Sequence, residues 1–473
     1  MNVPVIFWFR RDLRLEDNMG LRAAVRSGQP VIPLFIFDPD ILSSGRVGAP
    51  RLKFMLKALD GLSTELHKNQ REVLVRHGDP VDVLRDLIET TGADRLYFNR
   101  DYTPFARRRD EAITDALDIA VESFDDRLLM PPGAVLKDDG DPYAVYTPFK
   151  NKWRDMPDKP QIVSDYSVSA ANLHDLEGLK NDGIPTLADL GYDDTIDVPS
   201  AREGDAHDML EAWTQDGIYT YDEGRNRLGN PHDDPRTRTS FLSPYIRFGI
   251  ISTRTIYWAC RDAYSATRSE AKRASVGAFV DEIIWHEFYT HILWHFPKVQ
   301  THNFYEKYDG LQWRHAPDHL QAWKDGRTGF PVVDAAMRQL RAVGWMHNRA
   351  RMIVASFLTK DLLIDWREGE LYFMQWLIDG DLAANNGGWQ WAAGTGTDAQ
   401  PYFRIFNPVS QSQKFDQDGR FIRRWVPELR DVPDKHIHQP WKMQSPPPAY
   451  PAPIVDHKAA REAALDAYKA ARD

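Results

Sequence analysis

The sequence predicts an α/β domain with a parallel, Rossmann-like sheet, followed by a large all-α domain. From residue 3 to about 125, short β-rich apolar runs alternate with segments in which apolar residues recur every three or four positions. That alternation is typical of a parallel sheet with helices on both faces. From about residue 206 onward the periodicity is helical. We therefore expect domains at 1–130 and 206–473, joined by a connector at 131–205.

The first domain is expected to contain strands separated by helices. The expected strands are Val3–Phe9, Val31–Phe37, Val73–Arg76, Arg95–Asn99 and Ala120–Phe124. Two expected helices are Arg51–Asn69 and Pro80–Thr91. The first strand leads into Arg10-Arg11-Asp12-Leu13-Arg14 rather than into a Gly-rich dinucleotide fingerprint, which argues against a Rossmann-type NAD enzyme.

Residues 155–205 are rich in Asp, Pro, Ser and Gly and lack periodicity, which is typical of a connector. Helices are expected beyond it. They are Arg254–Tyr264, Val276–Trp294, Val332–Val343, His347–Leu363, Glu370–Ile378 and Lys458–Ala471. Gly344 stands where a helix-ending glycine is expected.

The composition indicates a globular protein of the reducing cytoplasm. Hydrophobic residues make up 42% of the chain and charged residues 27%, and no apolar run approaches the roughly 20 residues of a membrane span. A single cysteine, Cys260, excludes an internal disulfide framework. We expect a cytoplasmic monomer with no membrane segment.

The charge distribution leaves room for a nucleic-acid partner. The net charge of −10 argues against a general nucleic-acid coat protein, but local patches decide electrostatic binding. Residues 401–430 carry six Lys or Arg against three acidic side chains, a local excess of +3.

Tryptophan is concentrated in the second half of the chain. Of 15 tryptophans, only Trp8 and Trp153 precede residue 200. The concentration indicates either a large aromatic core or a site that stacks flat rings such as bases or a cofactor.

A predicted helix start follows three hydroxyl side chains, those of Thr237, Thr239 and Ser240, in the segment Thr237-Arg238-Thr239-Ser240-Phe241-Leu242-Ser243-Pro244. Ser243 is expected to be the N-cap, with Pro244 as the first helical residue. With Arg238 or Arg247 close by, the segment is either a natural anion site or simply a capped helix.

Two helices are each expected to present polar and aromatic side chains on one face. Glu282 and Trp285 are three residues apart on one helix. Asn348, Arg351 and Met352 share a face of another. Together they could line a pocket for a flat polar heterocycle; the alternative is a pair of ordinary amphipathic helices.

The run Asp379–Trp391 combines acidic and amide side chains with paired glycines and two tryptophans, an improbable composition for a surface loop. The carboxylates could accept hydrogen bonds from ring or ribose donors, and the glycines would permit close backbone approach. The alternative is a helix cap followed by a tight turn.

Metal, hydrolase and NTPase chemistry find little support. Glu287, His291 and His295 recur at four-residue spacing, but without Cys partners or a His-Glu-x-x-His motif we expect a polar helix face with local hydrogen bonds. No Gly-x-Ser-x-Gly elbow and no P-loop occurs in the sequence.

In this order, these segments resemble the photolyase/cryptochrome family across nearly the whole chain, most closely the class I cyclobutane-dimer photolyases. The motifs that carry the resemblance are Trp8–Arg14, Thr239–Ser243, Trp345–Arg349, and Asp361–Glu370 continuing through Asp379–Trp391 to Phe403–Pro408. The resemblance implies a lyase that repairs cyclobutane pyrimidine dimers in UV-damaged DNA. Photoexcited, reduced anionic FAD would pass an electron to the flipped-out lesion.

The resemblance also implies which residues bind FAD in the helical domain. Asn385 would face the flavin N5, and Arg351 would pair with Asp379. The implied cofactor residues are Tyr221, Thr239, Ser240, Phe241, Leu242, Ser243, Phe279, Arg351, Asp379, Asp381 and Asn385.

For the lesion, the resemblance implies that Glu282 and Asn348 contact the pyrimidines, with Trp285 and Trp391 as aromatic walls and Met352 beside them. Arg225 and Gln411 would contact the DNA backbone. Trp389, Trp366 and Trp313 would form a relay that re-reduces the flavin.

Three points depart from the family pattern or stay open. His286 stands where many members have Arg, so we expect a weaker phosphate or cofactor contact with more pH-sensitive binding. The Asn-Glu pair of folate-binding members is absent near Phe105-Ala106, so a deazaflavin, a second flavin or an empty antenna domain stay open. The rivals are a (6-4) photolyase, a light-sensing cryptochrome and an electron-transfer flavoprotein.

Overall fold

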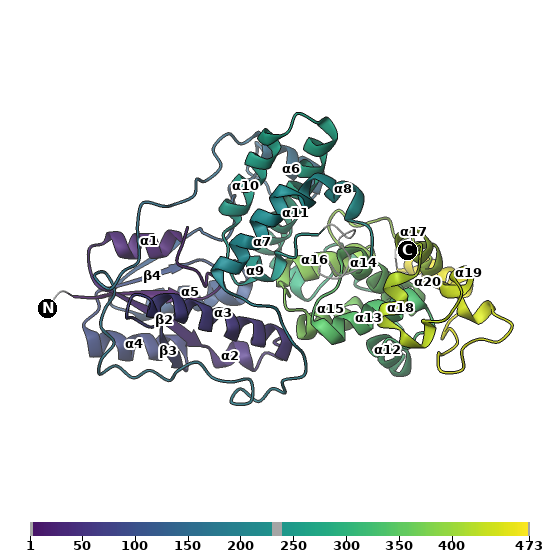
Figure 1. Ribbon diagram of the computed structural model, residues 1–473, viewed down its shortest axis with the longest axis horizontal. Helices are drawn as coiled ribbons and strands as arrows, with labels where there is room; N and C mark the ends of the chain where they lie inside the picture. The colour runs from purple at the N-terminus through teal and green to yellow at the C-terminus, as the bar shows by residue number, and fades with distance from the viewer. Residues whose placement is uncertain (1–2, 229–238, 472–473) are drawn as a thin grey trace.

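The computed structural model describes residues 3–228 and 239–471. Thr237 and Arg238, named above as part of an anion site, lie outside the described residues. The sheet domain lies at one end of the molecule and the helices of the second half of the chain at the other, as Figure 1 shows.

Within the described residues, five parallel strands form one sheet in the order β3-β2-β1-β4-β5, which confirms the predicted α/β domain. The strands are β1 Val5–Phe9, β2 Val31–Phe37, β3 Leu74–His77, β4 Arg95–Asn99 and β5 Ala120–Phe124. Alternate side chains of β1 enter two cores: Phe7 packs with one face and Trp8 with the other. Both faces are buried, which is why the strands read as continuous apolar runs.

The sheet helices begin at recognisable capping residues. Asp79 accepts from the backbone N–H groups of Val81 and Asp82 at the start of α4, with Pro80 as the first helical residue. The helices of this domain are α1 Met19–Arg26, α2 Pro39–Leu42, α3 Ala49–His67, α4 Pro80–Thr91 and α5 Pro104–Ala116.

The predicted connector contains one helix, α6 Tyr146–Asp155, which packs against α11. From there to α7 the described chain has no further named helix or strand, as its composition predicts.

The second half is helical, as predicted. Its longer helices are α7 Glu203–Gln215, α10 Thr253–Ala266, α11 Glu270–His295, α12 Pro317–Lys324, α13 Pro331–Val343, α14 Asn348–Ser356, α15 Trp366–Trp376, α16 Leu382–Ala393, α17 Pro408–Phe415 and α20 His457–Ala470. Short ones are η1 Gly217–Thr220, α8 Tyr221–Gly224, α9 Ser243–Arg247, η3 Pro297–Gln300, η4 Glu306–Tyr308, α18 Arg420–Trp425, η6 Pro427–Leu429, α19 Asp434–Ile437 and η7 Pro440–Lys442. Gly344 ends α13 with φ +63°, as expected.

Three local expectations need correction. The helix predicted at His347–Leu363 is α14 followed by a π-helix, η5 Phe357–Asp361. Ser243 is the first residue of α9 and not its N-cap, since its hydroxyl donates to Asp379. The run ending at Trp391 is a capped helix rather than a cap and tight turn, because the paired glycines lie inside α16.

Gly387 shows why glycine stands inside α16. A Cβ at this position would lie 2.1 Å from the ring of Tyr289, so only glycine lets α16 approach α11 this closely. The helix pair forms two walls of the cavity described below. Among residues 3–228 and 239–471, no helix combines the length and apolarity needed to cross a bilayer.

The buried carboxylate of Glu287 ties three segments together. It accepts hydrogen bonds from the backbone N–H of Leu129 at 2.5 Å and of Met130 at 3.2 Å, and from Trp153 Nε1 at 2.5 Å. The expectation of a polar helix face with local hydrogen bonds is therefore wrong for Glu287: its side chain is 1% exposed, and its partners come from segments distant in sequence. Burial raises the pKa of this carboxyl to about 7.

Replacing Glu287 should therefore destabilise the junction between the two halves. Glu287→Met leaves buried N–H donors without an acceptor, and we expect the free energy of unfolding to fall by ~2–4 kcal/mol. Glu287→Gln should lose less. Because the folded-state pKa is raised, the advantage of wild type over Glu287→Gln should shrink as pH rises from 5 to 8.

Urea unfolding followed by tryptophan fluorescence measures both effects. Glu270→Gln, on the same helix and with a 92% exposed side chain, is the control and should leave the midpoint unchanged. A Glu287→Met midpoint equal to that of this control would contradict the role assigned to the carboxylate.

Candidate functional site

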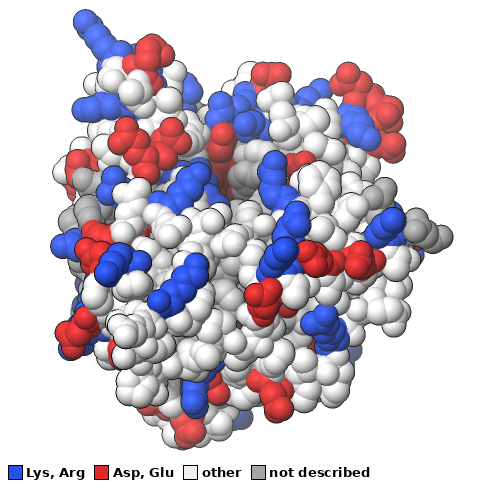
Figure 2. Space-filling model, turned by 90° about the vertical axis from the view of Figure 1, so that its right-hand side faces the viewer, with Lys and Arg blue, Asp and Glu red and all other residues white. Residues whose placement is uncertain are grey.

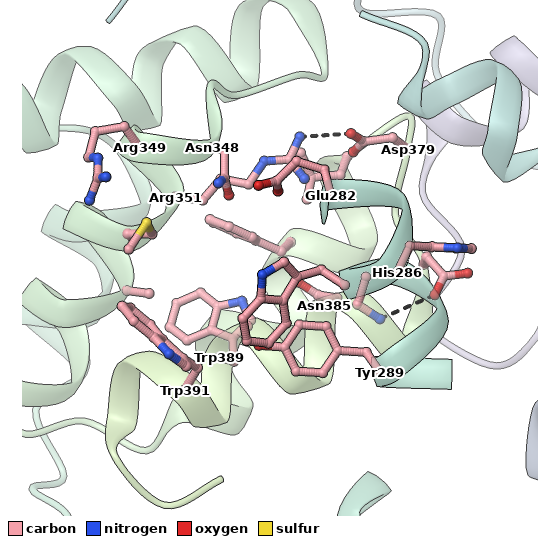
Figure 3. Close-up of a pocket in the computed structure, with 18 of the residues that line it drawn as sticks. Glu282, His286, Tyr289, Asn348, Arg349, Arg351, Asp379, Asn385, Trp389 and Trp391 are labelled. Carbon is pink, nitrogen blue, oxygen red and sulfur yellow. Dashed lines mark hydrogen bonds and ion pairs between the residues drawn. The ribbon is translucent and has the colours of Figure 1, made fainter. Parts of the chain in front are cut away.

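A cavity of about 390 Å³ lies between α11, α14, α15 and α16. Most of the predicted lesion and cofactor residues meet in its wall. Those that line it are Arg225, Glu282, Trp285, Asn348, Arg351, Met352, Asp379, Asp381, Asn385, Trp389 and Trp391. Figure 3 shows Glu282, Asn348 and Arg351 along one edge and Tyr289, Trp389 and Trp391 along the opposite edge.

The acidic edge of the cavity is an ion pair. Arg225 donates to Glu282 Oε1 at 2.5 Å, and its guanidinium lies 5.1 Å from the centre of the Tyr221 ring. Burial raises the pKa of Glu282, and the charge of Arg225 opposes that rise. The two side chains predicted to contact DNA separately are therefore partners of each other in the protein alone.

The aromatic wall at Trp285 extends into the connector. Trp285 stacks on Tyr146 of α6 with ring centroids 3.5 Å apart and an interplanar angle of 9°. The Tyr146 hydroxyl donates to the backbone oxygen of Asp281, which fixes the ring. Nothing in the sequence pointed to Tyr146, since a single aromatic residue in a polar connector carries no signal of its partner.

Asp379 is held by two donors on its Oδ2 atom. Arg351 donates to it at 2.8 Å, the pair that the resemblance implies, and Ser243 donates at 2.7 Å. Residues 239–243 do not line the cavity themselves. Ser243 contacts the cavity wall through its hydrogen bond to Asp379.

Asp381 lines the cavity, but its carboxylate is already engaged elsewhere. Oδ1 caps α16 by accepting from the N–H groups of Ala383 and Ala384. Oδ2 pairs with Arg11 at 2.7 Å and with Arg127 at 2.5 Å. Both arginines come from the N-terminal region, and together they hold the pKa of Asp381 well below its usual range.

His286 does not behave as the sequence analysis expected. Burial and the neighbouring Arg127 lower the pKa of its imidazole to about 4. The ring is therefore neutral from pH 6 to 8, and the expected pH sensitivity of binding in that range has no basis in this side chain.

Three buried polar atoms in the cavity wall lack hydrogen-bond partners within the described residues: His286 Nδ1, Asp379 Oδ1 and Trp389 Nε1. Such atoms are costly unless a ligand or water satisfies them. Gly388 also faces open space, with nothing within 4 Å of a Cβ placed there. The wall thus fits a flat ligand with donors and acceptors along its edge.

Other predicted residues lie outside the described cavity wall. Tyr221 packs edge-on against Phe279 at 5.4 Å, and Phe241 packs on Trp345 at 5.0 Å. Those away from the wall are Tyr221, Thr239, Ser240, Phe241, Leu242, Ser243, Phe279, Trp313, Trp366 and Gln411. Trp366 is fully buried in the core that contains Trp389, and Trp313 is partly buried and packs against that core.

A second cavity of about 400 Å³ lies beside the first, at the carboxyl ends of the sheet strands. Its wall includes Phe9 and Arg10 at the end of β1, Asp38 after β2 and Asp101 after β4. In open α/β sheets, this edge is the usual place for a ligand. Arg11 lines this cavity and also pairs with Asp381, so the two cavities share a charged wall.

Two of the three residues first considered as metal ligands, Glu287 and His291, have other hydrogen-bond partners. His291 donates a ring N–H to the backbone oxygen of Tyr143 at 3.2 Å. Among the described residues, the cluster with ligand-like spacing is Glu16, Glu203 and His207. Both oxygens of Glu203 there accept backbone N–H groups.

Two family models match the chain. "DNA photolyase" matches residues 5–164, and "FAD binding domain of DNA photolyase" matches residues 279–470. A deoxyribodipyrimidine photo-lyase of Halobacterium salinarum is 43% identical, with 99% of each chain covered.

Solved structures of photolyases have a similar fold over nearly the whole length of this chain. A bacterial class III photolyase from Agrobacterium tumefaciens has a TM-score of 0.89 and 37% identity, covering 100% of this chain and 98% of its own. An archaeal photolyase from Sulfolobus tokodaii, described with two FAD molecules, has a TM-score of 0.82 and 33% identity, covering 99% and 100%.

Arg11 and Arg127, which together form an arginine clamp on Asp381, should contribute measurably to stability. Asp381→Asn keeps an oxygen to cap α16 but removes the nearer of the two carboxylates that Arg11 and Arg127 share, so that Asp101 alone remains to balance both guanidinium groups. Removing one partner of a buried ion pair costs about 3–5 kcal/mol, so the unfolding midpoint in urea should drop sharply.

Asp325→Asn is the matched control, since Asp325 pairs with Arg341 where both side chains are at least 33% exposed. We expect this change to cost less than ~1 kcal/mol. Equal losses for the two variants would show that the arginine clamp contributes no more than a surface pair.

Proposed function

The chain belongs to the DNA photolyase family, and we propose that it repairs cyclobutane pyrimidine dimers in UV-damaged DNA by a light-dependent reaction with FAD as cofactor. The observation that carries the proposal is the cavity wall. It combines hydrogen-bonding side chains, Glu282 and Asn348, with the indoles of Trp285 and Trp391. Amide and carboxyl groups suit the edges of pyrimidines, and the indoles suit their faces.

The part of the wall formed by α16 and the loop before it suits the cofactor. Within the described residues, Asp379 Oδ1 and Trp389 Nε1 in this part of the wall, and His286 Nδ1 on the adjoining α11, are buried atoms without hydrogen-bond partners. Gly388 leaves room for a ring against the backbone. The remainder of FAD would extend beyond this cavity, where it would contact Tyr221, Phe279 and residues 239–243. When bound and reduced, FAD supplies the electron that opens the cyclobutane ring after blue-light excitation and takes it back afterwards.

The lesion must leave the duplex to enter the cavity. Flipping costs a few kcal/mol, less for a damaged and poorly stacked pair, and photolyases belong to the enzymes known for this step. Stacking on Trp285 offsets part of the cost, at ~1–3 kcal/mol per base. Because Trp285 is already stacked on Tyr146, little side-chain freedom is lost when the base arrives.

Glu282 acts on the pyrimidine oxygens that gain negative charge. In the structure, Arg225 Nη2 balances the Glu282 carboxylate at 2.5 Å. If Arg225 turns to a DNA phosphate, Glu282 loses its cation, and burial then favours the protonated acid. The acid donates a hydrogen bond to the charged pyrimidine, and Asn348 donates from the neighbouring helix.

The DNA surface is proposed around the C-terminal helices. Figure 2 shows that face with Lys and Arg intermixed with Asp and Glu, and a hollow in its upper part flanked by basic side chains. Gln411 lies on α17, within the locally positive segment 401–430. Such scattered cations suit phosphate contacts that position a duplex without reading its sequence.

Trp389, Trp366 and Trp313 are proposed to carry electrons from the surface to the flavin. Trp389 lines the cavity, Trp366 is buried in the same core, and Trp313 packs against that core while partly exposed. The order of exposure suits a relay that ends at solvent.

The second cavity is proposed to hold a light-harvesting chromophore. Phe105 and Ala106 line it where folate-binding members have an Asn-Glu pair, so a deazaflavin or a second flavin fits better than a folate. The Sulfolobus tokodaii photolyase described with two FAD molecules supports a flavin as one occupant.

The rivals are weaker on specific residues. A (6-4) photolyase usually has His where Asn348 stands. A light sensor without repair activity has no need of the Glu282–Arg225 pair beside two indoles, and an electron-transfer flavoprotein has no need of a lesion-sized cavity.

Repair is tested with photoreduced protein and two oligonucleotides, one with a thymine cyclobutane dimer and one with a (6-4) lesion. We expect blue light, and not darkness, to restore thymines in the first alone, as measured by chromatography. Glu282→Ala should lower the yield about tenfold or more, since a charge-assisted hydrogen bond is worth ~1.5–3 kcal/mol, whereas Glu282→Gln keeps an N–H donor and should lose less. Glu270→Gln on the same helix should repair normally. No repair of either lesion by the FAD-bound protein would refute the proposal.

The relay is tested with Trp366→Phe. This variant should fail to reduce its bound FAD in light with an external donor, while chemically reduced protein still repairs the dimer. Trp323→Phe is the matched control, because Trp323 is equally buried and lies 6.0 Å from Trp389. Normal photoreduction in Trp366→Phe with loss in Trp323→Phe would move the relay to Trp323.

A further inference from the structure

Trp366 is the position in the proposed relay where a positive charge is hardest to hold. Its side chain is fully buried, so water cannot solvate the radical cation that remains when the indole gives up an electron. The guanidinium of Arg367 lies 4.6 Å from the centre of the Trp366 ring and opposes that charge. Asp365 pairs with Arg367 at 3.1 and 3.2 Å and offsets this repulsion. The charge therefore has to be stabilised by the polar group that touches the indole.

The buried amide of Asn303 is the hydrogen-bond partner of this indole. Trp366 Nε1 donates to Asn303 Oδ1 at 2.9 Å, and Asn303 Nδ2 donates to Asp309 Oδ1 at 2.8 Å. The orientation of the amide is unambiguous, because an indole N–H can only donate and a carboxylate can only accept. The negative charge of Asp309 polarises the amide, so the oxygen that faces the indole gains electron density.

The segment that carries Asn303 is docked on α16. On either side of Asn303, the side chain of Gln390 accepts from the backbone N–H of Phe304 at 2.8 Å and donates to the backbone oxygen of His302 at 3.2 Å. Asp309 Oδ1 also accepts from the backbone N–H of Asn303 at 3.0 Å. The amide oxygen is therefore fixed against the indole before any charge arrives there, and no reorganisation is needed when it does.

We propose that Asn303, polarised by Asp309, is a positioning residue that stabilises the positive charge on Trp366 and keeps the indole proton on Nε1 while the charge is there. The inference rests on the proposed function, which assigns Trp366 to the relay. One electron leaves Trp366 for oxidised Trp389, and one electron from Trp313 then replaces it. An amide oxygen accepts a hydrogen bond but is too weak a base to take the proton, so no proton has to return to a buried nitrogen in the second step.

Trp313→Phe isolates the step, because the charge then stops at Trp366. In this background, a light flash on protein with oxidised FAD bound should leave a protonated tryptophan radical, recognised by its visible absorption. Asn303→Leu removes the acceptor and should shift the charge back toward Trp389. Its recombination with the flavin should then be faster by about tenfold or more, the worth of a hydrogen bond to a charged group. An unchanged recombination rate would overturn the inference.

Exchanging the two polar groups separates this role from a merely structural one. Asn303→Asp combined with Asp309→Asn keeps the total charge and a donor–acceptor pair behind the indole, but it places a carboxylate against Trp366 Nε1. A carboxylate is basic enough to take the proton of an oxidised indole. In the Trp313→Phe background we therefore expect the absorption of the neutral tryptophan radical. A protonated radical in the exchanged variant would contradict the inference, since amide and carboxylate would then act alike.

A milder change keeps the test decisive if Asn303→Leu fails to fold. Asp309→Asn keeps an oxygen for both N–H groups of Asn303 and removes only the charge, so recombination should be faster by ~2- to 5-fold, as for a solvent-screened charge. Glu306→Gln removes an equal charge from the same exposed turn and should have no such effect. Equal acceleration in Asp309→Asn and Glu306→Gln would refute the proposal.

Trp366→Phe separates the two levels of failure. Normal photoreduction of FAD in this variant would refute the proposed relay and the inference together. Loss of photoreduction in Trp366→Phe, with the same radical absorption and recombination rate in all the Asn303 and Asp309 variants, would refute the inference alone.

Discussion

The carboxylate of Asp381 at the start of α16 is the interaction on which the functional half of the molecule depends. It caps the helix with one oxygen and pairs with Arg11 and Arg127 through the other. Desolvating a carboxylate is expensive, so such a group is tolerated only when its charge and lone pairs are matched. Here the matching cations come from the N-terminal region, so α16 has its defined position only when both halves of the chain are folded together.

The opposite end of α16 is held by a buried lysine, whose pKa burial lowers well below its usual range. Lys360, in the π-helix η5, donates to the backbone oxygen of Ala393 at 2.7 Å, and the Tyr468 hydroxyl donates to the same oxygen. The Asp381 carboxylate at the N-terminus of α16 complements the helix dipole. The helix between these two contacts carries Asn385, Trp389 and Trp391, so the cavity wall is rigid where it meets a ligand. A π-helix at a functional site is a common departure from regular geometry.

The same region is densely packed, yet within the described residues some of its buried polar atoms have no hydrogen-bond partner. Gly369 lies so close to Trp389 that a Cβ would be 2.1 Å from the indole, while Trp389 Nε1 has no partner among the described residues. Proteins break local rules mainly at functional sites, and unpaired polar atoms inside a tightly packed wall are such a break. The stability lost there is recovered in contacts such as Glu287, which ties the connector and both halves together.

Much of this protein was determined by sequence alone, because its signals are local. Continuous apolar runs alternating with three- and four-residue periodicity identified the parallel sheet and the long helices, since each element must bury its own apolar surface. Residues on one helical turn, such as Glu282 and Trp285, were correctly grouped on one wall, and the motifs led to the family.

The tertiary structure alone decided which residues pair when they are distant in sequence. Nothing local in Asp381 indicates that its charge is consumed by Arg11 and Arg127, or in Trp285 that it stacks on Tyr146. The neutrality of His286 likewise follows from burial among arginines of another domain. Charge state and amide orientation depend on the surrounding field and partners, and these exist only once the chain has folded.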